Sequence, residues 1–139
     1  MKIDTSFLTR CIAALDKANT LLKEYEVEDI EYDIYRSAVI KEFEIILEQS
    51  GKLLKKTLKP YFHTSKAVDK LYFKDIFREA GNHSLLEIEE VQRWCEYRDN
   101  RNNTSHDYGE YLANNTLVLI EQFIVDAKRL AVVVSNDDN

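Results

Sequence analysis

Glycine and proline are scarce in this sequence, with three glycines and one proline among 139 residues. Both residue types mark the turns of strand-rich folds, so their scarcity favours long helices over a sheet architecture. The one proline, Pro60, is expected to end a helix, because proline disfavours helical geometry in the residue before it. Apolar residues make up 45% of the chain, enough for one hydrophobic core, and the length predicts a single domain over residues 1–139.

Long apolar runs, paired cysteines and excess positive charge are also missing. No signal peptide or membrane-spanning run is recognisable, and we expect a cytoplasmic protein. Cys11 and Cys95 lie at apolar helical positions far apart in the sequence, which predicts buried thiols in a reducing compartment, with neither a disulfide nor a metal site. The net charge of −6 excludes a general nucleic-acid coat. Any RNA contact must then be local, at a patch such as Arg93, Arg98 and Arg101.

Apolar residues recur every three or four positions in four long stretches, which is the spacing of amphipathic helices. The first begins at Thr5 or Ser6, and the others cover about 30–59, 84 to the region of Arg98, and about 110–134. A short helix is expected over 73–80, after a loop over 63–70. We therefore predict an all-α, up-and-down four-helix bundle with one additional short helix.

Local signals refine the ends of these helices. Asp29 is a candidate cap for the second helix, and Gly81 is expected to close the short one. Ser84 with Glu87 has the form of a capping box, while the acidic run from Glu87 to Glu90 is expected to be a solvated face. The apolar faces of the second and last long helices are wider than one core needs, which predicts a homodimer.

The stretch from Arg98 to Tyr108 contains no aliphatic residue, although apolar helical sequence flanks it on both sides. A buried helix would not tolerate so many polar groups without partners. Arg101 and His106 are five residues apart, so a continuous helix separates them by about 140° around its axis. To act on one ligand they need either a helix that loosens over residues 102–105, whose side chains lower helix propensity, or a second subunit.

An arginine with a histidine, and without a set of metal ligands, suits phosphodiester chemistry. A guanidinium forms two-point, charge-assisted bonds with phosphate oxygens and stabilises the charge that develops in the transition state. An imidazole that titrates near neutral pH can take a proton from a ribose 2′-hydroxyl or give one to the leaving 5′-oxygen. Attack by the 2′-hydroxyl needs no metal-activated water and restricts the reaction to RNA.

The hexapeptide from Arg101 to His106 resembles the arginine–four residues–histidine signature of HEPN domains, and Tyr108 extends it to the longer form of that signature. The wider pattern is similar to the branch called nucleotidyltransferase substrate-binding proteins, over nearly the whole chain. Its residues are Phe77, Arg78, Glu79, Ala80, Trp94, Arg98, Asn102 and Thr104 to His106.

This resemblance implies a homodimer with facing motifs and, in toxin–antitoxin members, a metal-independent ribonuclease. It also implies a nucleotidyltransferase partner that silences the toxin, in some pairs by transferring AMP to the tyrosine. Carried over, Arg101 would hold the phosphate, His106 would be the acid or base, Asn102 would orient one of them, and Tyr108 would be modified. No cofactor is implied.

The sequence leaves two alternatives for each of two residues near the motif, and two alternatives for the function. Arg98 either lines the site or pairs with a nearby acid, and Asp107 either orients His106 or caps the last helix. The first functional hypothesis is the ribonuclease toxin neutralised by a nucleotidyltransferase. The second is a non-catalytic substrate-binding subunit of a two-component nucleotidyltransferase, which the net acidity favours, since the chain has no extended basic track for RNA.

Overall fold

The computed structural model describes residues 2–106 and 110–136, with side chains described for 2–101 and 114–136. Within these residues all regular structure is helical, which confirms the predicted all-α class. The elements are α1 (Ser6–Leu22), α2 (Ile30–Leu58), the 3₁₀ turn η1 (Lys59–Tyr61), α3 (Ser65–Asp69), α4 (Phe73–Asn82), α5 (Ile88–His106) and α6 (Glu110–Ser135).

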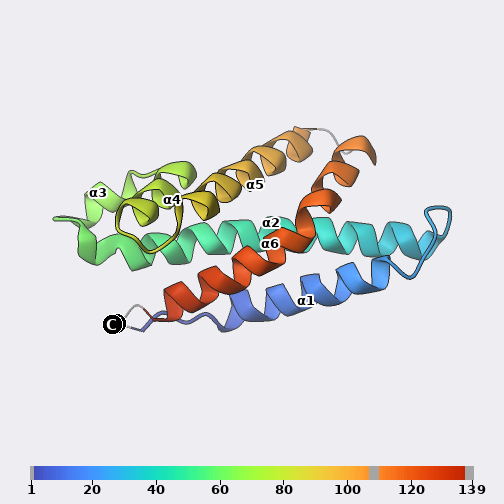
Figure 1. Ribbon diagram of the computed structural model, residues 1–139, viewed down its shortest axis with the longest axis horizontal. Helices are drawn as coiled ribbons and strands as arrows, with labels where there is room; N and C mark the ends of the chain where they lie inside the picture. Colours follow the sequence, from blue (N-terminus) through green and yellow to red (C-terminus); the bar gives the residue numbers. More distant parts are fainter. Residues whose placement is uncertain (1, 107–109, 137–139) are drawn as a thin grey trace.

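The four long helices alternate in direction along the chain, as an up-and-down bundle requires (Figure 1). Helix α2 contacts α1, α4, α5 and α6. Figure 1 shows α1 along one side of α2, α5 along the other, and α6 crossing the middle. The short helices α3 and α4 lie near the end of α2, and α5 leads away from them towards its junction with α6.

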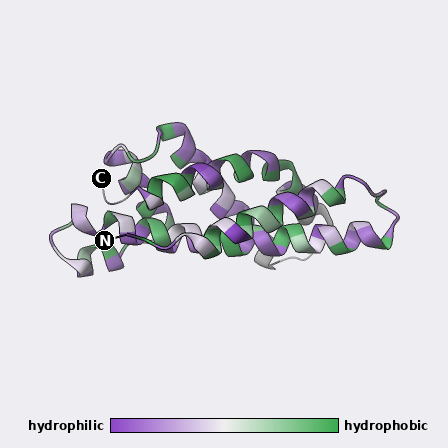
Figure 2. Cartoon of the chain, turned by 90° about the horizontal axis from the view of Figure 1, so that it is seen from below, coloured by the Kyte–Doolittle hydropathy of each residue, from purple (hydrophilic) through white to green (hydrophobic). Residues whose placement is uncertain are grey.

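The core between α2, α4, α5 and α6 is aromatic. Trp94 of α5 is fully buried and stacks on Phe77 of α4, with ring centres 4.8 Å apart. Phe43 and Phe123 bring α2 and α6 together at 4.7 Å. Burying each such side chain contributes about 1.5–3 kcal/mol, so α5 is held firmly through its middle. Polar and apolar bands alternate along the helices (Figure 2), as the periodicity predicted.

The chain between α2 and α4 contains one more helix than expected. Residues 65–69 form α3 where the sequence predicted a loop. Thr64 caps it, because its Oγ1 accepts a hydrogen bond from the Ala67 N–H at 3.2 Å. The single apolar residue buried by this helix is Val68. A helix of five residues is too short to produce a periodic pattern, which explains why the sequence did not indicate it.

The connection between α4 and α5 also differs from the prediction. Gly81 lies within α4, and its φ is not positive. An added Cβ there would lie 3.0 Å from Val91 Cγ2, so the glycine serves the close packing of α4 on α5. Ser84 instead adopts the left-handed conformation, with φ 62°. The expected capping box at Ser84 is therefore wrong. A cap at Ser84 would start α5 at Leu85, whereas the helix starts three residues later, at Ile88.

Two acidic residues near helix starts have roles that the sequence did not predict. Asp29 precedes α2 as expected, but its carboxylate accepts from the Glu26 N–H at 3.0 Å and not from the first turn of the helix. Glu90 is only 8% exposed and accepts from the Glu87 N–H at 3.0 Å. It therefore stabilises the start of α5 and is not part of a solvated face.

The structure tests two further expectations. Cys11 is buried and Cys95 half-buried, and neither forms a disulfide. Burial raises the pKa of both thiols, with Glu42 adding to the effect at Cys11, so both are poor nucleophiles. Among the described residues, no helix has the length and apolar character needed to span a bilayer.

Candidate functional site

Helix α5 carries most of the predicted site residues on its last three turns. Its first half is fixed in the core by Trp94, and Tyr97, which is 1% exposed, continues that packing towards the motif. Edge-to-face contact with Phe123 at 4.9 Å holds Tyr97 against α6. Because α5 continues without a break to His106, the motif extends directly from the packed part of the helix.

Arg98 is held by residues of two neighbouring helices. Its Nη1 donates to Glu48 Oε1 of α2 at 2.8 Å, and its guanidinium carbon lies 4.9 Å from the ring centre of Phe73 in α4. Asp99, the next residue, pairs with Lys74 at 2.6 Å. Of the two alternatives left open by the sequence, pairing of Arg98 with an acid is observed, and that acid is Glu48; a role of Arg98 in lining the site stays a prediction.

Arg101, one turn further along α5, lines a surface groove of about 360 Å³. Residues of α1, α2 and α5 line the groove, and Glu48 borders it as well as contacting Arg98. An arginine that lines a water-accessible groove can bind a phosphate, although the acids beside it reduce the attraction for a polyanion. The other lining residues are Phe7, Glu44, Ile45 and Gln49.

His106 lies on the same continuous helix as Arg101. Residues 102–105 are helical, so of the two alternatives that the sequence left open, the structure does not show a loosened helix: the weak intrinsic preferences of asparagine, threonine and serine do not overcome helix continuation here. Five helical residues separate the two positions by about 140° around the axis. The side chains of Asn102 and His106, and the whole of Asp107 and Tyr108, lie outside the described part of the structure.

A buried carboxylate that is not among the predicted site residues lies next to this region. Asp126 of α6 is 2% exposed and accepts four hydrogen bonds. Arg93 donates through Nε at 2.8 Å and Nη2 at 2.9 Å, the Tyr97 hydroxyl donates at 2.5 Å, and Gln122 donates at 3.2 Å. An aspartate within the apolar stripe of α6 was the available signal, since buried carboxylates occur only with partners.

This cluster sets the charge state of its members. The hydrogen bond with Asp126 raises the pKa of Arg93, which remains charged. Burial, followed by the hydrogen bond to Asp126, raises the pKa of the Tyr97 phenol. Arg93 therefore pairs with α6 while Arg98 pairs with α2.

A second polar contact joins α5 to α6 closer to the motif. Thr116, which is fully buried, donates from Oγ1 to Asn100 Oδ1 at 2.5 Å. Asn100 directly precedes Arg101. The first described turns of α6 are thus tied to the turn of α5 that presents the arginine, and the two helices are joined on both sides of Tyr97.

Comparison with known proteins places this bundle in a family. A family model described as nucleotidyltransferase substrate binding protein like matches residues 5–135. The chain belongs to that family. A protein of Haemophilus influenzae named probable ribonuclease HepT is a relative of this chain, and the two sequences are 33% identical over 98 residues. The match covers 70% of this chain and 66% of that relative, so the chain spans slightly less than two thirds of its length.

Two solved structures share the fold. A Haemophilus influenzae protein, described as having the fold of a substrate binding domain of a nucleotidyltransferase, matches with a TM-score of 0.78 and 26% identity, over 94% of this chain and 98% of that one. A protein of Thermus thermophilus matches with a TM-score of 0.65 and 24% identity, over 86% of this chain and 98% of that one. The second likeness concerns the fold alone.

Proposed function

We propose that this chain is a metal-independent endoribonuclease of a toxin–antitoxin pair, a single HEPN-like domain acting in the cytoplasm and neutralised by a minimal nucleotidyltransferase. The observation that carries the proposal is the intact arginine–histidine motif at the end of α5, with Arg101 lining an open groove. Membership of the substrate-binding protein family and the name of the relative, probable ribonuclease HepT, support it.

The continuous helix supports a meeting of the two groups across a dimer. The positions of Arg101 and His106 in one chain lie about 140° apart around α5, so we propose a homodimer in which the motifs face each other across a two-fold axis. Arg101 of one copy then binds the scissile phosphate beside His106 of the other copy. A symmetric dimer contains two such composite sites.

In each site the RNA supplies its own nucleophile. The 2′-oxygen attacks the adjacent phosphorus and the bond to the 5′-oxygen breaks, leaving a cyclic phosphate. His106 takes the proton of the 2′-hydroxyl or gives one to the departing 5′-oxygen. The guanidinium of Arg101 stabilises the added negative charge. We assign Asn102 to orienting Arg101 or His106, and Asp107 to orienting His106 or capping α6. Arg98, fixed by Glu48, positions the end of α5.

Neutralisation would act at Tyr108. Its phenol oxygen attacks the α-phosphate of ATP bound to the partner nucleotidyltransferase, pyrophosphate leaves, and the tyrosine retains AMP. The added phosphodiester places negative charge and bulk two residues after His106, where it opposes binding of an RNA phosphate. The partner itself is supported by the description of the family as nucleotidyltransferase substrate binding proteins.

The test is cleavage of single-stranded RNA by the purified protein in EDTA. We expect wild type to cut RNA into products with cyclic phosphate ends, and Arg101→Ala and His106→Ala to lose at least about a hundredfold in rate. Arg78→Ala is the matched control, because Arg78 is an exposed arginine on α4 that pairs only with Asp75 in the described interactions. Intact RNA with wild type, or equal cleavage by all variants, contradicts the proposal.

A second candidate function is a non-catalytic subunit that presents a substrate to a nucleotidyltransferase. The carboxylates of Glu44 and Glu48 beside Arg101 favour it, because they weaken attraction for RNA. In that case the complex with the nucleotidyltransferase requires this chain for transfer activity, while RNA incubated with either protein stays intact. The RNA assay separates the two candidates; the existence of the partner does not.

A further inference from the structure

The outer face of α6 carries a line of exposed valines. Val118, Val125 and Val132 are 81%, 59% and 55% exposed. Residues seven apart on a helix differ by only about 20° around its axis, so the three side chains form one stripe on the face that points away from the core. Apolar residues repeated at this interval are typical of a helix that packs against another helix.

Charged and polar residues flank the valine stripe in a regular way. Glu121 and Lys128 are also seven apart and follow one flank, while Gln122 and Arg129 follow the other; all four are exposed. Glu121 pairs with Lys23, and Lys128 lies 3.5 Å from Asp16. Exposed pairs of this kind contribute roughly 0–1 kcal/mol, which leaves both side chains able to engage a further charge.

We propose that α6 packs antiparallel against α6 of a second copy of this chain, about a two-fold axis that passes beside Val125. The axis brings the two Val125 side chains together and places Val118 of each copy beside Val132 of the other. It also places Glu121 of each copy opposite Lys128 of the other copy, on the same side of the interface. The dimer therefore contains two such pairs. In a parallel two-fold pair the flank of Lys128 would instead meet the flank of Arg129 of the other copy, which opposes like charges, so the charges select the antiparallel arrangement.

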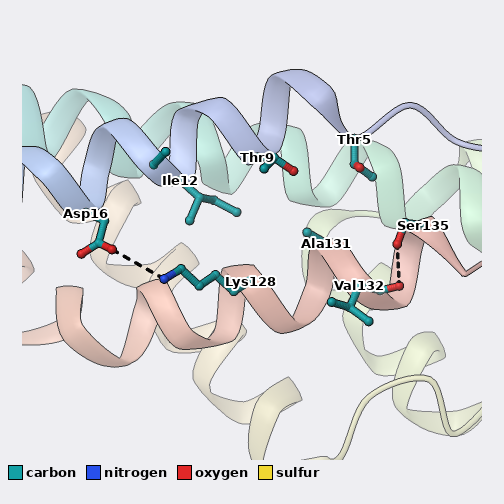
Figure 3. Close-up of a pocket in the computed structure, with 9 residues that line it drawn as sticks. Thr5, Thr9, Ile12, Asp16, Lys128, Ala131, Val132 and Ser135 are labelled. Atoms are coloured by element: carbon teal, nitrogen blue, oxygen red, sulfur yellow. Dashed lines mark hydrogen bonds and ion pairs between the residues drawn. The ribbon is translucent and has the colours of Figure 1, made fainter.

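The surface is hollowed where the second copy would arrive. A groove of about 410 Å³ lies between α1 and α6, with Ile12, Ala131 and Val132 among its lining residues (Figure 3). Asp16 and Lys128 stand at one end of it, and Thr5 and Ser135 at the other (Figure 3). In the antiparallel pair Val118, the most exposed of the three valines, reaches the edge of this groove in the other copy.

This contact is different from the proposed dimer contact in which the two arginine–histidine motifs face each other. Thr116 bonds to Asn100 beside Arg101, and it precedes Val125 by nine residues, or about 13 Å along the helix. The two motifs would consequently lie about 27 Å apart along the paired helices. The α6 contact therefore does not form a composite site. The α6 contact does not depend on the ribonuclease proposal. If the motifs also face each other in a separate dimer contact, the two contacts together would join dimers into a larger assembly.

Crosslinking tests the register of the pair. Single cysteines are introduced as Val125→Cys, Val118→Cys and Val132→Cys and treated with a short thiol-to-thiol reagent. We expect Val125→Cys to link to itself, and the other two to link to each other when mixed far better than either links alone. Wild type measures the background from the native cysteines, and Lys17→Cys, exposed on α1, controls for random collision. Self-linking of Val125→Cys no stronger than that of Lys17→Cys overturns the proposal.

A charge exchange tests the contact without crosslinking. Glu121→Lys and Lys128→Glu should each weaken association by about tenfold in sedimentation, because two ion pairs per dimer become like-charge contacts. The double variant should restore it. The pairs that these residues form within the chain, with Lys23 and Asp16, stay broken in the double variant, so recovery reports the contact between copies alone. A double variant as weak as the single ones overturns the proposal, and circular dichroism verifies that each variant is folded.

Discussion

Arg93 and Asp126 form a two-point ion pair across the interface of α5 and α6, with nitrogen–oxygen distances of 2.8 and 2.9 Å. The carboxylate is almost fully buried, while the arginine side chain is about one-third exposed. A planar guanidinium meeting both carboxylate oxygens fixes distance and orientation together. The Arg93–Asp126 ion pair therefore sets how α6 lies against α5, the helix that carries the motif.

Removing the carboxylate should destabilise the fold. Asp126→Ala leaves the buried Tyr97 hydroxyl and the Arg93 guanidinium without their acceptor, and we expect a loss of about 2–4 kcal/mol in the free energy of unfolding. Urea denaturation measures it. Asp16→Ala is the control, since Asp16 pairs with Lys128 on the surface and should cost no more than about 1 kcal/mol. Equal losses in the two variants would show that the buried cluster adds nothing.

Stability should fall at high pH because of Tyr97. Folding raises the pKa of this phenol through burial and the bond to Asp126, so the folded state holds the proton more tightly than the unfolded chain. The resulting stabilisation is complete below the unfolded pKa of about 10 and is lost as the pH rises above that value. Tyr97→Phe should lower stability at neutral pH by about 1 kcal/mol yet reduce the further decline between pH 9 and 11. A decline identical to that of wild type would exclude Tyr97 as its cause.

Mixing two inactive variants tests whether the catalytic groups come from different chains. A mixed dimer of Arg101→Ala and His106→Ala contains one composite site with both native groups and one with neither. Random mixing should recover about a quarter of the wild-type rate, since half the dimers are mixed and each has one working site. RNA cleavage before and after subunit exchange measures this. No recovery, despite exchange confirmed by mass spectrometry, would require both groups to act within one chain.

Mass spectrometry tests the proposed modification. Co-expression with the nucleotidyltransferase should add one AMP to a peptide containing Tyr108, and Tyr108→Phe should abolish the addition. Tyr111→Phe is the matched control, because Tyr111 lies only three residues further along the chain. If the unmodified protein still binds its partner and is inhibited, silencing proceeds through contact and not through transfer.

Periodic apolar sequence predicted the four long helices well, because each buries a stripe of several turns. The start of α2 at Ile30 follows directly from it. Helix α3 and the start of α5 escaped prediction, since they depend on one or two local hydrogen bonds, at Thr64 and Glu90. Such bonds compete with several alternatives of similar free energy.

The candidate site was predictable in its residue types and less so in its arrangement. The motif itself stands out as a polar stretch between apolar helices, and Arg101 does line a groove. The partners of the arginines could not be foreseen, because Glu48 and Asp126 are 50 and 33 residues away from Arg98 and Arg93. Only the packing of α2 and α6 on α5 brings these carboxylates near.

The single tryptophan of the chain is Trp94, stacked in the aromatic core two turns before Arg101 on an unbroken helix. Its intrinsic fluorescence thus reports on the packing from which the motif extends. Heating that disorders the core would shift this emission and remove the support of the arginine in one event, giving the optical and the biochemical melting curves a common midpoint.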